Sequence, residues 1–166
     1  MPTLPHRILY VHHAAVLGGA EISLLELIRC LDRARYDPVA MLPGEGPLTF
    51  ALRELNVPIH FAPLRRLKRS WNPVRWLQYA QSARRVAAQV REIVQRLHID
   101  LIHLNGWPAM FFLSSAVRGL PCVLHLRDVA VPRLVQRQFS RRITRIIAVS
   151  NAVARLSPPG RTVVIH

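Results

Sequence analysis

The stretch Gly18-Gly19-Ala20-Glu21 has the residue types of an anion-binding turn. Two adjacent glycines allow a ligand to approach the backbone closely, and the unpaired N–H groups in the first turn of a helix attract negative charge. A Gly-Gly pair is equally typical of an ordinary tight turn, with Glu21 placed near the positive end of the following helix. The local residues therefore support both a binding turn and a purely structural one.

The elements around this stretch form a repeating strand–helix pattern. The apolar run 8–11 precedes the glycines, and apolar residues at three- and four-residue steps follow them up to residue 31. Further apolar runs predict strands over 39–42, 57–61, 101–104, 122–125, 146–149 and 162–165, with helical patterns over 47–55, 72–97, 107–118, 132–142 and after Ser150. Because the strands are continuous apolar runs, we predict an α/β fold: a Rossmann-like, doubly wound parallel sheet of about six or seven strands with helices on both faces.

The carboxyl ends of parallel strands form one edge of such a sheet, and ligands bind beyond that edge. The fingerprint Gly-x-Gly-x-x-Gly is absent after the first strand, and the chain has no Gly-Lys-Ser/Thr phosphate loop, which excludes NAD and ATP enzymes of those types. The residues expected at this edge are His12-His13 with the glycine turn, Pro43-Gly44, the basic loop after Phe61, Asn105-Gly106, the run from His125 to Asp128, and Ser150-Asn151.

The charge of the chain is unevenly distributed. Residues 1–62 contain 5 Arg and 6 acidic residues, a net charge of −1, whereas residues 63–166 contain 18 Lys or Arg and 3 acidic residues, a net charge of +15. Codon bias toward arginine does not explain the shortage of acidic residues in the second part. The basic part predicts an anionic partner: phosphates, acidic lipid, nucleic acid or an acidic domain.

Length and composition predict a single domain over residues 1–166 in the cytoplasm. The 166 residues suffice to bury a core, the N-terminus has no apolar signal segment, and no apolar run approaches the roughly 20 residues that span a bilayer. The two cysteines, Cys30 and Cys122, have no metal-ligand spacing and are expected to be small buried residues. We expect no bound metal and no cofactor.

The motifs in this order resemble the N-terminal domain of family 4 glycosyltransferases. They are Ile8-Leu-Tyr-Val11, Gly-Gly-Ala-Glu21, Leu-Pro-Gly-Glu-Gly-Pro-Leu48, Asp100-Leu-Ile-His103, Gly-Leu-Pro-Cys-Val-Leu-His125 and Ile-Ile-Ala-Val-Ser150. The resemblance implies a retaining GT-B enzyme, in which two Rossmann-like domains face a cleft and sugar passes from a nucleotide-sugar to a glycan or lipid-linked acceptor without a metal. It implies that this chain is the acceptor-side domain, that the donor-binding C-terminal domain lies beyond His166, and that residues 1–166 are inactive alone.

The same resemblance implies roles for individual residues. His125 is expected near the reacting sugar as the catalytic residue, with a strand-end histidine satisfied by the backbone as the alternative. Gly18, Gly19 and Ser150 are expected at the donor phosphates, although Ser150 also suits a helix cap. Family members often have Asp directly after this His, whereas here Leu126 and Arg127 separate His125 from Asp128. The residues expected to bind the acceptor are His13, Asn105, Trp107, Arg127 and Asp128.

A basic segment beside an aromatic residue suggests contact with an anionic membrane. Arg65, Arg66, Lys68, Arg69 and Trp71 form this segment, which suits the interfacial region of a bilayer at the inner face of the cell membrane. A solvated loop is the alternative. Two other functions remain open for the whole chain: a basic domain that binds nucleic acid or membrane without catalysis, and an interaction module. The chain has no recognisable nucleic-acid motif and lacks the exposed aromatic residues of single-strand binders, which disfavours nucleic acid.

Overall fold

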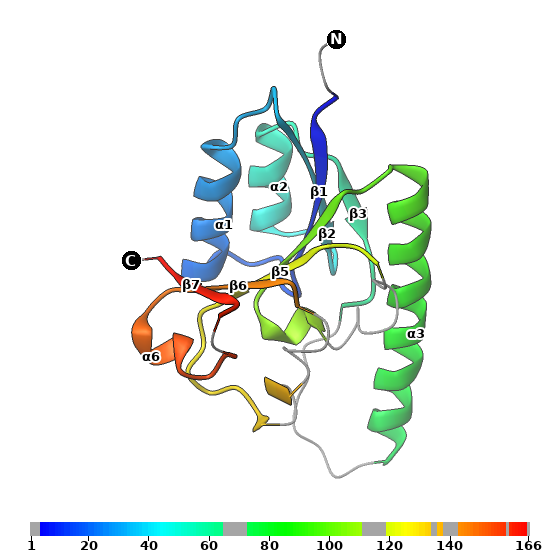
Figure 1. Ribbon diagram of the computed structural model, residues 1–166. Coiled ribbons are helices and arrows are strands. Elements are labelled where there is room, and N and C mark those ends of the chain that lie inside the picture. The colour runs from blue at the N-terminus through cyan, green and yellow to red at the C-terminus, as the bar shows by residue number, and fades with distance from the viewer. Residues whose placement is uncertain are drawn as a thin grey trace.

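The computed structural model describes residues 4–64, 73–110, 119–133, 136–137, 143–158 and 160–165. In these residues seven strands form one parallel sheet in the order β3-β2-β1-β4-β5-β6-β7 (Figure 1). This arrangement confirms the predicted doubly wound α/β sheet. The strands are β1 (His6–Val11), β2 (Tyr36–Leu42), β3 (Ile59–Phe61), β4 (Leu101–Asn105), β5 (Cys122–Leu126), β6 (Arg145–Ala148) and β7 (Thr162–Val164).

Helices cover both faces of this sheet. α1 (Gly19–Arg29) and α2 (Pro47–Glu54) lie side by side against one face, and α3 (Pro73–Arg96) lies against the other (Figure 1). The short η1 (Trp107–Ala109) and α6 (Asn151–Ala154) follow β4 and β6. The predicted helices over 107–118 and 132–142 fall largely outside the described residues.

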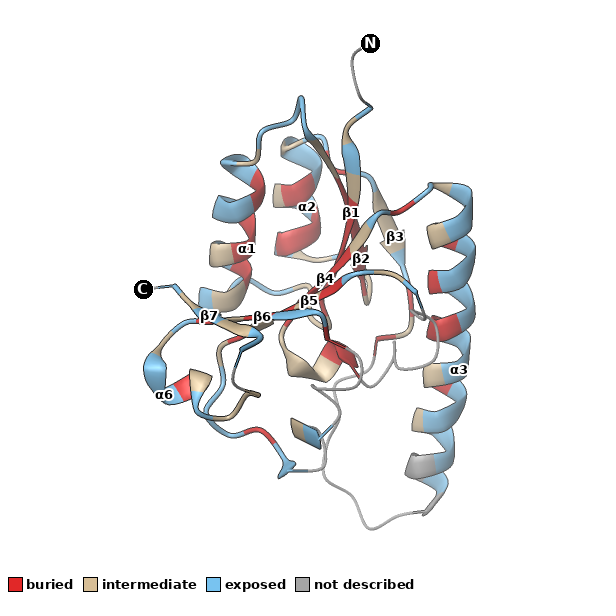
Figure 2. Ribbon diagram, in the orientation of Figure 1, coloured by how far each residue is buried: buried red, intermediate tan, exposed pale blue. Residues whose placement is uncertain are grey.

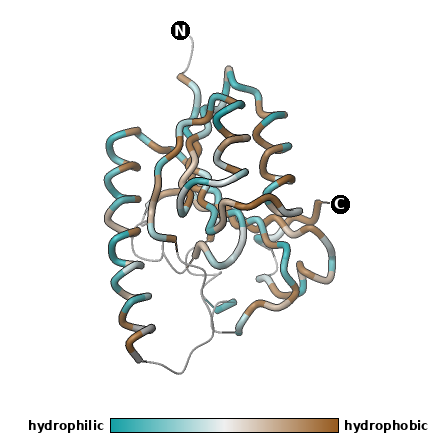
Figure 3. Tube along the Cα trace, turned by 180° about the vertical axis from the view of Figure 1, so that it is seen from behind, coloured by the Kyte–Doolittle hydropathy of each residue, from teal (hydrophilic) through white to brown (hydrophobic). Residues whose placement is uncertain are grey.

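Alternate residues of β1, β2 and β4 pack into two separate cores, as the twofold period of a strand requires. Leu9 and Val11 of β1 belong to the core beneath α3, whereas Ile8 and Tyr10 belong to the core beneath α1 and α2. Burial is concentrated on the strands and on the inner sides of the helices (Figure 2). Along α3 hydrophilic and hydrophobic segments alternate, as expected of a helix with one buried side (Figure 3).

The face of the sheet beneath α1 changes from apolar to polar toward the carboxyl ends of its strands. In β1, Ile8 and Tyr10 are followed two residues later by His12, which is buried. In β4, His103 pairs in register with Tyr10, and their ring centroids lie 5.0 Å apart. Asn105 in turn pairs with His125 of β5. The periodicity that builds the core therefore also aligns these polar side chains under the N-terminal end of α1.

The prediction that both cysteines are buried is wrong for one of them. Cys122 is buried at the start of β5, but Cys30 is exposed. α1 buries Leu24, Leu25 and Ile28. At 100° per residue, Cys30 is rotated about 200° from Ile28, which places it on the solvent side of the helix. The predicted strand over 57–61 is also shorter, because the N–H of Val57 bonds the carbonyl of Leu52 at 3.0 Å and the β3 ladder begins at Ile59.

Gly46, the N-cap of α2, allows a close approach between two backbone segments. A Cβ at this position would lie 2.4 Å from the carbonyl oxygen of Ala15. That carbonyl accepts the N–H of Leu48 at 3.0 Å. The contact fixes the segment between β1 and α1 against α2, and with it the course of the chain into Gly18.

We therefore expect Gly46→Ala to destabilise the fold by about 1–3 kcal/mol, the usual range for forced overpacking. Gly44→Ala is the matched control, because a Cβ there would have no heavy atom within 4 Å. Urea unfolding of both variants measures the difference. Equal stability of the two variants would contradict the close approach of Ala15 and Gly46.

Candidate functional site

The strand order places the topological switch point of the sheet between β1 and β4. From β1 the chain builds outward through β2 and β3, and then returns to the other side of β1 as β4. Connections that leave neighbouring strands in opposite directions open a crevice at their carboxyl ends. A pocket of about 320 Å³ lies there, which we call the switch-point pocket. It is lined by His12, His13, Ala20, Glu21, Asn105, Gly106, Trp107, Pro108, Arg127, Asp128 and Ala130.

His12 joins the N-terminal end of α1 to β4. Its Nδ1 lies 2.8 Å from the backbone carbonyl of Asn105, and its Nε2 lies 2.5 Å from Oε1 of Glu21. A carbonyl oxygen only accepts hydrogen bonds, so Nδ1 carries a proton and donates it to Asn105. A hydrogen bond joins Nε2 to Oε1 of Glu21. His12 is 1% exposed and Glu21 7%, so this pair is withdrawn from solvent.

The second carboxylate oxygen of Glu21 caps α1. Oε2 accepts the N–H of Gly18 at 3.0 Å, the reciprocal bond of a capping box. Burial acts to raise the pKa of Glu21, but the hydrogen bonds from His12 and from the backbone outweigh it and hold that pKa below its usual range. Glu21 is therefore the helix-start residue expected from the sequence, and its carboxylate is occupied within the protein.

Asn105, at the end of β4, connects this pair to Arg127. It is 1% exposed. Its Nδ2 donates to the carbonyl of Ala20 at 3.2 Å, and its Oδ1 accepts a hydrogen bond from Nη1 of Arg127. Both ends of the amide are thus used within the protein, which fixes the side chain in one orientation.

Arg127 is held by side chains from α1, β4 and β5. In addition to the bond to Asn105, its Nη2 lies 2.9 Å from Oγ of Ser23 and 3.1 Å from Nδ1 of His125. Because Nδ1 of His125 accepts this bond, the ring proton of His125 is on Nε2. We call Glu21, His12, Asn105, Arg127, Ser23 and His125 the polar network.

The two histidines beneath Arg127 are neutral at physiological pH. Burial, together with the charge of Arg127, lowers the pKa of His125 to about 4. Burial lowers the pKa of His103 to about 3, with smaller contributions from His125 and Arg127. The rings of His103 and His125 lie 5.8 Å apart, and Nε2 of His103 has no hydrogen-bond partner among the described residues. The site thus offers a guanidinium and neutral imidazoles, a combination suited to hydrogen bonding and to binding negative charge.

A family model described as the glycosyl transferase 4-like domain matches residues 18–166 of the chain. The chain belongs to this family. The match covers most of the sequence and confirms the family that the motifs indicate. No curated protein matches the chain.

Solved structures share the fold of this glycosyltransferase domain. HepE from Anabaena, in complex with UDP-glucose, is 22% identical with a TM-score of 0.69, covering 96% of this chain and 43% of that one. MurG from Acinetobacter baumannii is 15% identical with a TM-score of 0.67, covering 96% of this chain and 45% of that one. Sucrose-phosphate synthase from Thermosynechococcus elongatus is 14% identical with a TM-score of 0.67, covering 96% of this chain and 47% of that one. The chain spans less than half the length of each.

The structure brings together the residues predicted to bind the acceptor. His13, Asn105, Trp107, Arg127 and Asp128 all line the switch-point pocket. Their role in acceptor binding stays a prediction, and Asn105 contributes by holding Arg127.

The other predicted residues lie around or away from this pocket. His125 is half-buried beneath Arg127. Gly18 is the N-cap of α1, and a Cβ on Gly19 would meet no heavy atom within 4 Å. Ser150 caps α6, its Oγ accepting the N–H of Val153 at 3.3 Å. Arg65, Arg66, Lys68, Arg69 and Trp71 lie outside the described residues.

Sequence reasoning placed His12 at the ligand-binding edge without a role and missed Ser23. His12 continues the alternation of Ile8 and Tyr10, so the twofold period already placed it beneath α1. Ser23 lies one turn from Gly19 on α1, but nothing in the sequence indicates that Arg127 contacts it. Within the part of the chain that the structure describes, no group of three or more His, Cys, Asp or Glu residues could hold a metal ion.

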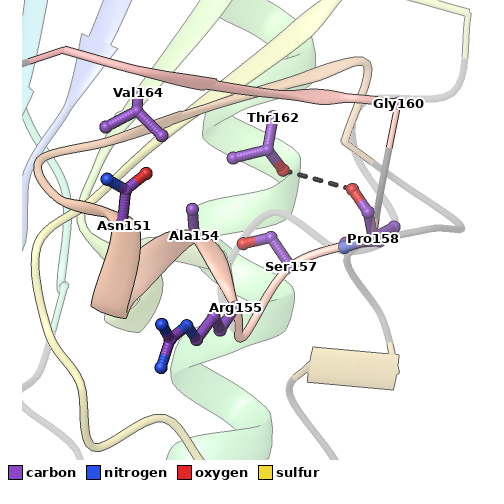
Figure 4. Close-up of a pocket in the computed structure, with 8 residues that line it drawn as sticks. All are labelled: Asn151, Ala154, Arg155, Ser157, Pro158, Gly160, Thr162 and Val164. Carbon is purple, nitrogen blue, oxygen red and sulfur yellow. Dashed lines mark hydrogen bonds between the residues drawn. The ribbon is translucent and has the colours of Figure 1, made fainter.

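A second pocket, of about 530 Å³, lies between α6 and β7 (Figure 4). Asn151, Arg155 and Ser157 line it from α6 and the following turn, and Thr162 Oγ1 donates to the carbonyl of Pro158 at 3.2 Å (Figure 4). It shares no lining residue with the switch-point pocket and contains one charged side chain. We therefore take the switch-point pocket, smaller but built on the polar network, as the candidate site.

The charge of Arg127 helps to keep His125 neutral, which gives a prediction for NMR. In Arg127→Gln the pKa of His125 should rise from about 4 toward, but not to, its ordinary value, because burial also lowers it. Ring-proton shifts followed from pH 3.5 to pH 8 measure both values. An unchanged pKa of His125 in the variant would show that Arg127 exerts no electrostatic effect on it.

Proposed function

We propose that this chain is the acceptor-side domain of a retaining glycosyltransferase. The enzyme would transfer a sugar from a nucleoside-diphosphate sugar to a glycan or lipid-linked acceptor. The observation that carries this proposal is the switch-point pocket, which lies at the ligand-binding edge of a glycosyl transferase 4-like domain. Side chains of the polar network form part of its lining. The fold has neither a dinucleotide fingerprint nor a phosphate loop to hold the nucleotide on this half.

The donor class is proposed from the structural neighbours. HepE has been solved with UDP-glucose, with UDP and glucose, and with UDP. At 22% identity this likeness supports only the class of donor for our chain, a nucleotide-sugar. Since the chain corresponds to less than half of these proteins, we propose that a second domain, outside these 166 residues, holds most of the nucleotide.

We propose that His125, in the acceptor-side domain, contacts the reacting sugar of the donor. Its Nδ1 is occupied by Arg127, and its neutral ring carries a proton on Nε2. We propose that Nε2–H donates a hydrogen bond to a sugar hydroxyl near the reacting carbon, which orients the donor. Neutral His125 would not act as a general acid at neutral pH, since its pKa is about 4.

Contact with an anionic membrane remains a proposal that rests on the sequence. The described residues include no helix long and apolar enough to cross a bilayer. The basic segment 65–71 and the +15 charge of residues 63–166 favour a surface attachment at the inner face of the cell membrane, close to a lipid-linked acceptor.

The division between two domains is tested by titrating residues 1–166 with UDP-, GDP- and ADP-glucose in a calorimeter. We expect no binding tighter than about millimolar, which corresponds to roughly −4 kcal/mol. Tight binding selective for one nucleotide would contradict the assignment of the donor site to another domain.

The role of His125 is tested in the active enzyme that contains this domain. His125→Ala should lower kcat by about 100-fold, the effect of removing one positioned donor from a reacting centre. His6→Ala, an exposed histidine on the same sheet, is the control and should have unchanged kcat. NMR of the product should show the anomeric configuration of the donor. Unchanged kcat in His125→Ala would refute its role, and an inverted product would refute the retaining mechanism.

A further inference from the structure

The side chain of Arg127 is a half-buried cation whose hydrogen-bond partners are all neutral. They are Oδ1 of Asn105, Oγ of Ser23 and Nδ1 of His125. None of the ion pairs formed within the described residues includes Arg127, so no described carboxylate oxygen lies within 4.0 Å of its guanidinium nitrogens. Buried arginines are normally paired with a carboxylate or a phosphate, because removing the charge from water is costly.

The two nearest acidic groups do not fill this role. Glu21 is occupied by His12 and by the N–H of Gly18. Asp128 is exposed at the margin of the pocket. Burial lowers the pKa of Arg127, and the charges of Glu21 and Asp128 only partly offset that effect. The neighbouring imidazoles, His125 and His103, are neutral, so of these three side chains Arg127 carries the positive charge.

The guanidinium is also held in a fixed orientation with donors to spare. An arginine has five N–H donors, and the polar network uses three of them. Contacts to residues from α1, β4 and β5 remove most of the side-chain freedom that binding a ligand would otherwise cost. The two donors left, Nε–H and one N–H of Nη1, can each give a charge-assisted hydrogen bond to a carboxylate or phosphate oxygen.

We propose that Arg127 binds an anionic group, a phosphate or a carboxylate, carried by the acceptor in the switch-point pocket. This inference rests on the proposed function, because it takes the ligand of this pocket to be the acceptor. Trp107 and Pro108, which follow β4, provide an apolar wall for the uncharged part of the ligand. The carboxylate of Glu21 already lies at the N-terminal end of α1, where it offsets the partial positive charge of that end. The acceptor is thus a charged sugar or a phosphate-linked one, and a neutral glycan lacks the group that Arg127 requires.

Three matched probes test the charge requirement: glucose 6-phosphate, glucuronate and glucose. Each is titrated into the isotope-labelled protein up to about 20 mM and followed by NMR. This concentration exceeds the millimolar Kd expected for a ligand that makes a few contacts. We expect saturable shifts at Ser23, Asn105 and the Nε–H of Arg127 with at least one charged probe, and none with glucose. Equal shifts with glucose, or no saturable shift with either charged probe, would overturn the proposal.

Substitutions assign the effect to Arg127. Arg127→Gln should weaken binding of the charged probe by about 10-fold or more, as expected for losing a charge-assisted pair. Arg155→Gln, in the pocket beside α6, makes the same change of net charge and should leave the affinity unchanged. Arg127→Lys keeps the charge but loses the planar guanidinium, with its donors and its bonds to Asn105, Ser23 and His125, and should weaken binding while keeping the fold. Unchanged affinity in both Arg127 variants would overturn the proposal.

A further titration tests whether the anion at Arg127 belongs to the acceptor or to the donor. Pyrophosphate represents the diphosphate of a nucleotide-sugar, and it should bind at this position more weakly than glucose 6-phosphate or glucuronate. Tighter binding of pyrophosphate at Arg127 would overturn the assignment to the acceptor. Tight binding of UDP-glucose elsewhere on residues 1–166 would instead refute the proposed division between domains and leave the charge requirement of Arg127 standing.

Discussion

The bond between His12 and Glu21 is the constraint on which the geometry of the site depends. It joins the loop after β1 to the first turn of α1, while the other nitrogen of His12 binds the backbone of Asn105 at the end of β4. Three elements thus meet at one imidazole that is 1% exposed. Buried polar atoms without partners would be costly, so the three elements are held in one arrangement. That arrangement turns the side chain of Asn105 toward Arg127.

The site is a continuation of the core. On the face beneath α1, the side chains of β1 change from Ile8 and Tyr10 to His12, and those of β4 change from Leu101 to His103 and Asn105. Core packing therefore fixes the direction of each polar side chain, while η1 contributes Trp107 and Pro108, and the segment after β5 contributes Asp128. A half-buried arginine with neutral partners costs stability, and the anion that we propose at Arg127 would offset that cost.

The sequence predicts the fold well because strands and helices follow from local periodicity. The apolar runs, the proline that begins α2 and the serine that caps α6 are local signals, and the structure confirms them. Cys30 was misplaced because the apolar pattern over 22–31 does not show where α1 ends. The close approach of Gly46 to Ala15 was not foreseen, since no local pattern reports a contact between segments 31 residues apart.

The site could be predicted only in part for the same reason. The carboxyl ends of the strands indicate which residues share an edge, and the structure places His13, Asn105, Trp107, Arg127 and Asp128 in one pocket at that edge. Their role in binding the acceptor stays a prediction. The hydrogen bonds between them depend on the course of loops and on side-chain orientation. Nothing in the sequence shows that Asn105 and Ser23 hold Arg127, or that Ser150 lies at α6 and outside the switch-point pocket.

A double-mutant cycle between Asn105 and Arg127 tests most directly whether the polar network orients the guanidinium for its ligand. The quantity measured is the affinity for glucose 6-phosphate in Asn105→Ala, Arg127→Lys and the double variant. If Asn105 acts through Arg127, each single substitution lowers the affinity. The double variant then has the same affinity as the single variant that binds less tightly. Additive losses, or an Asn105→Ala variant with unchanged affinity, would contradict the account.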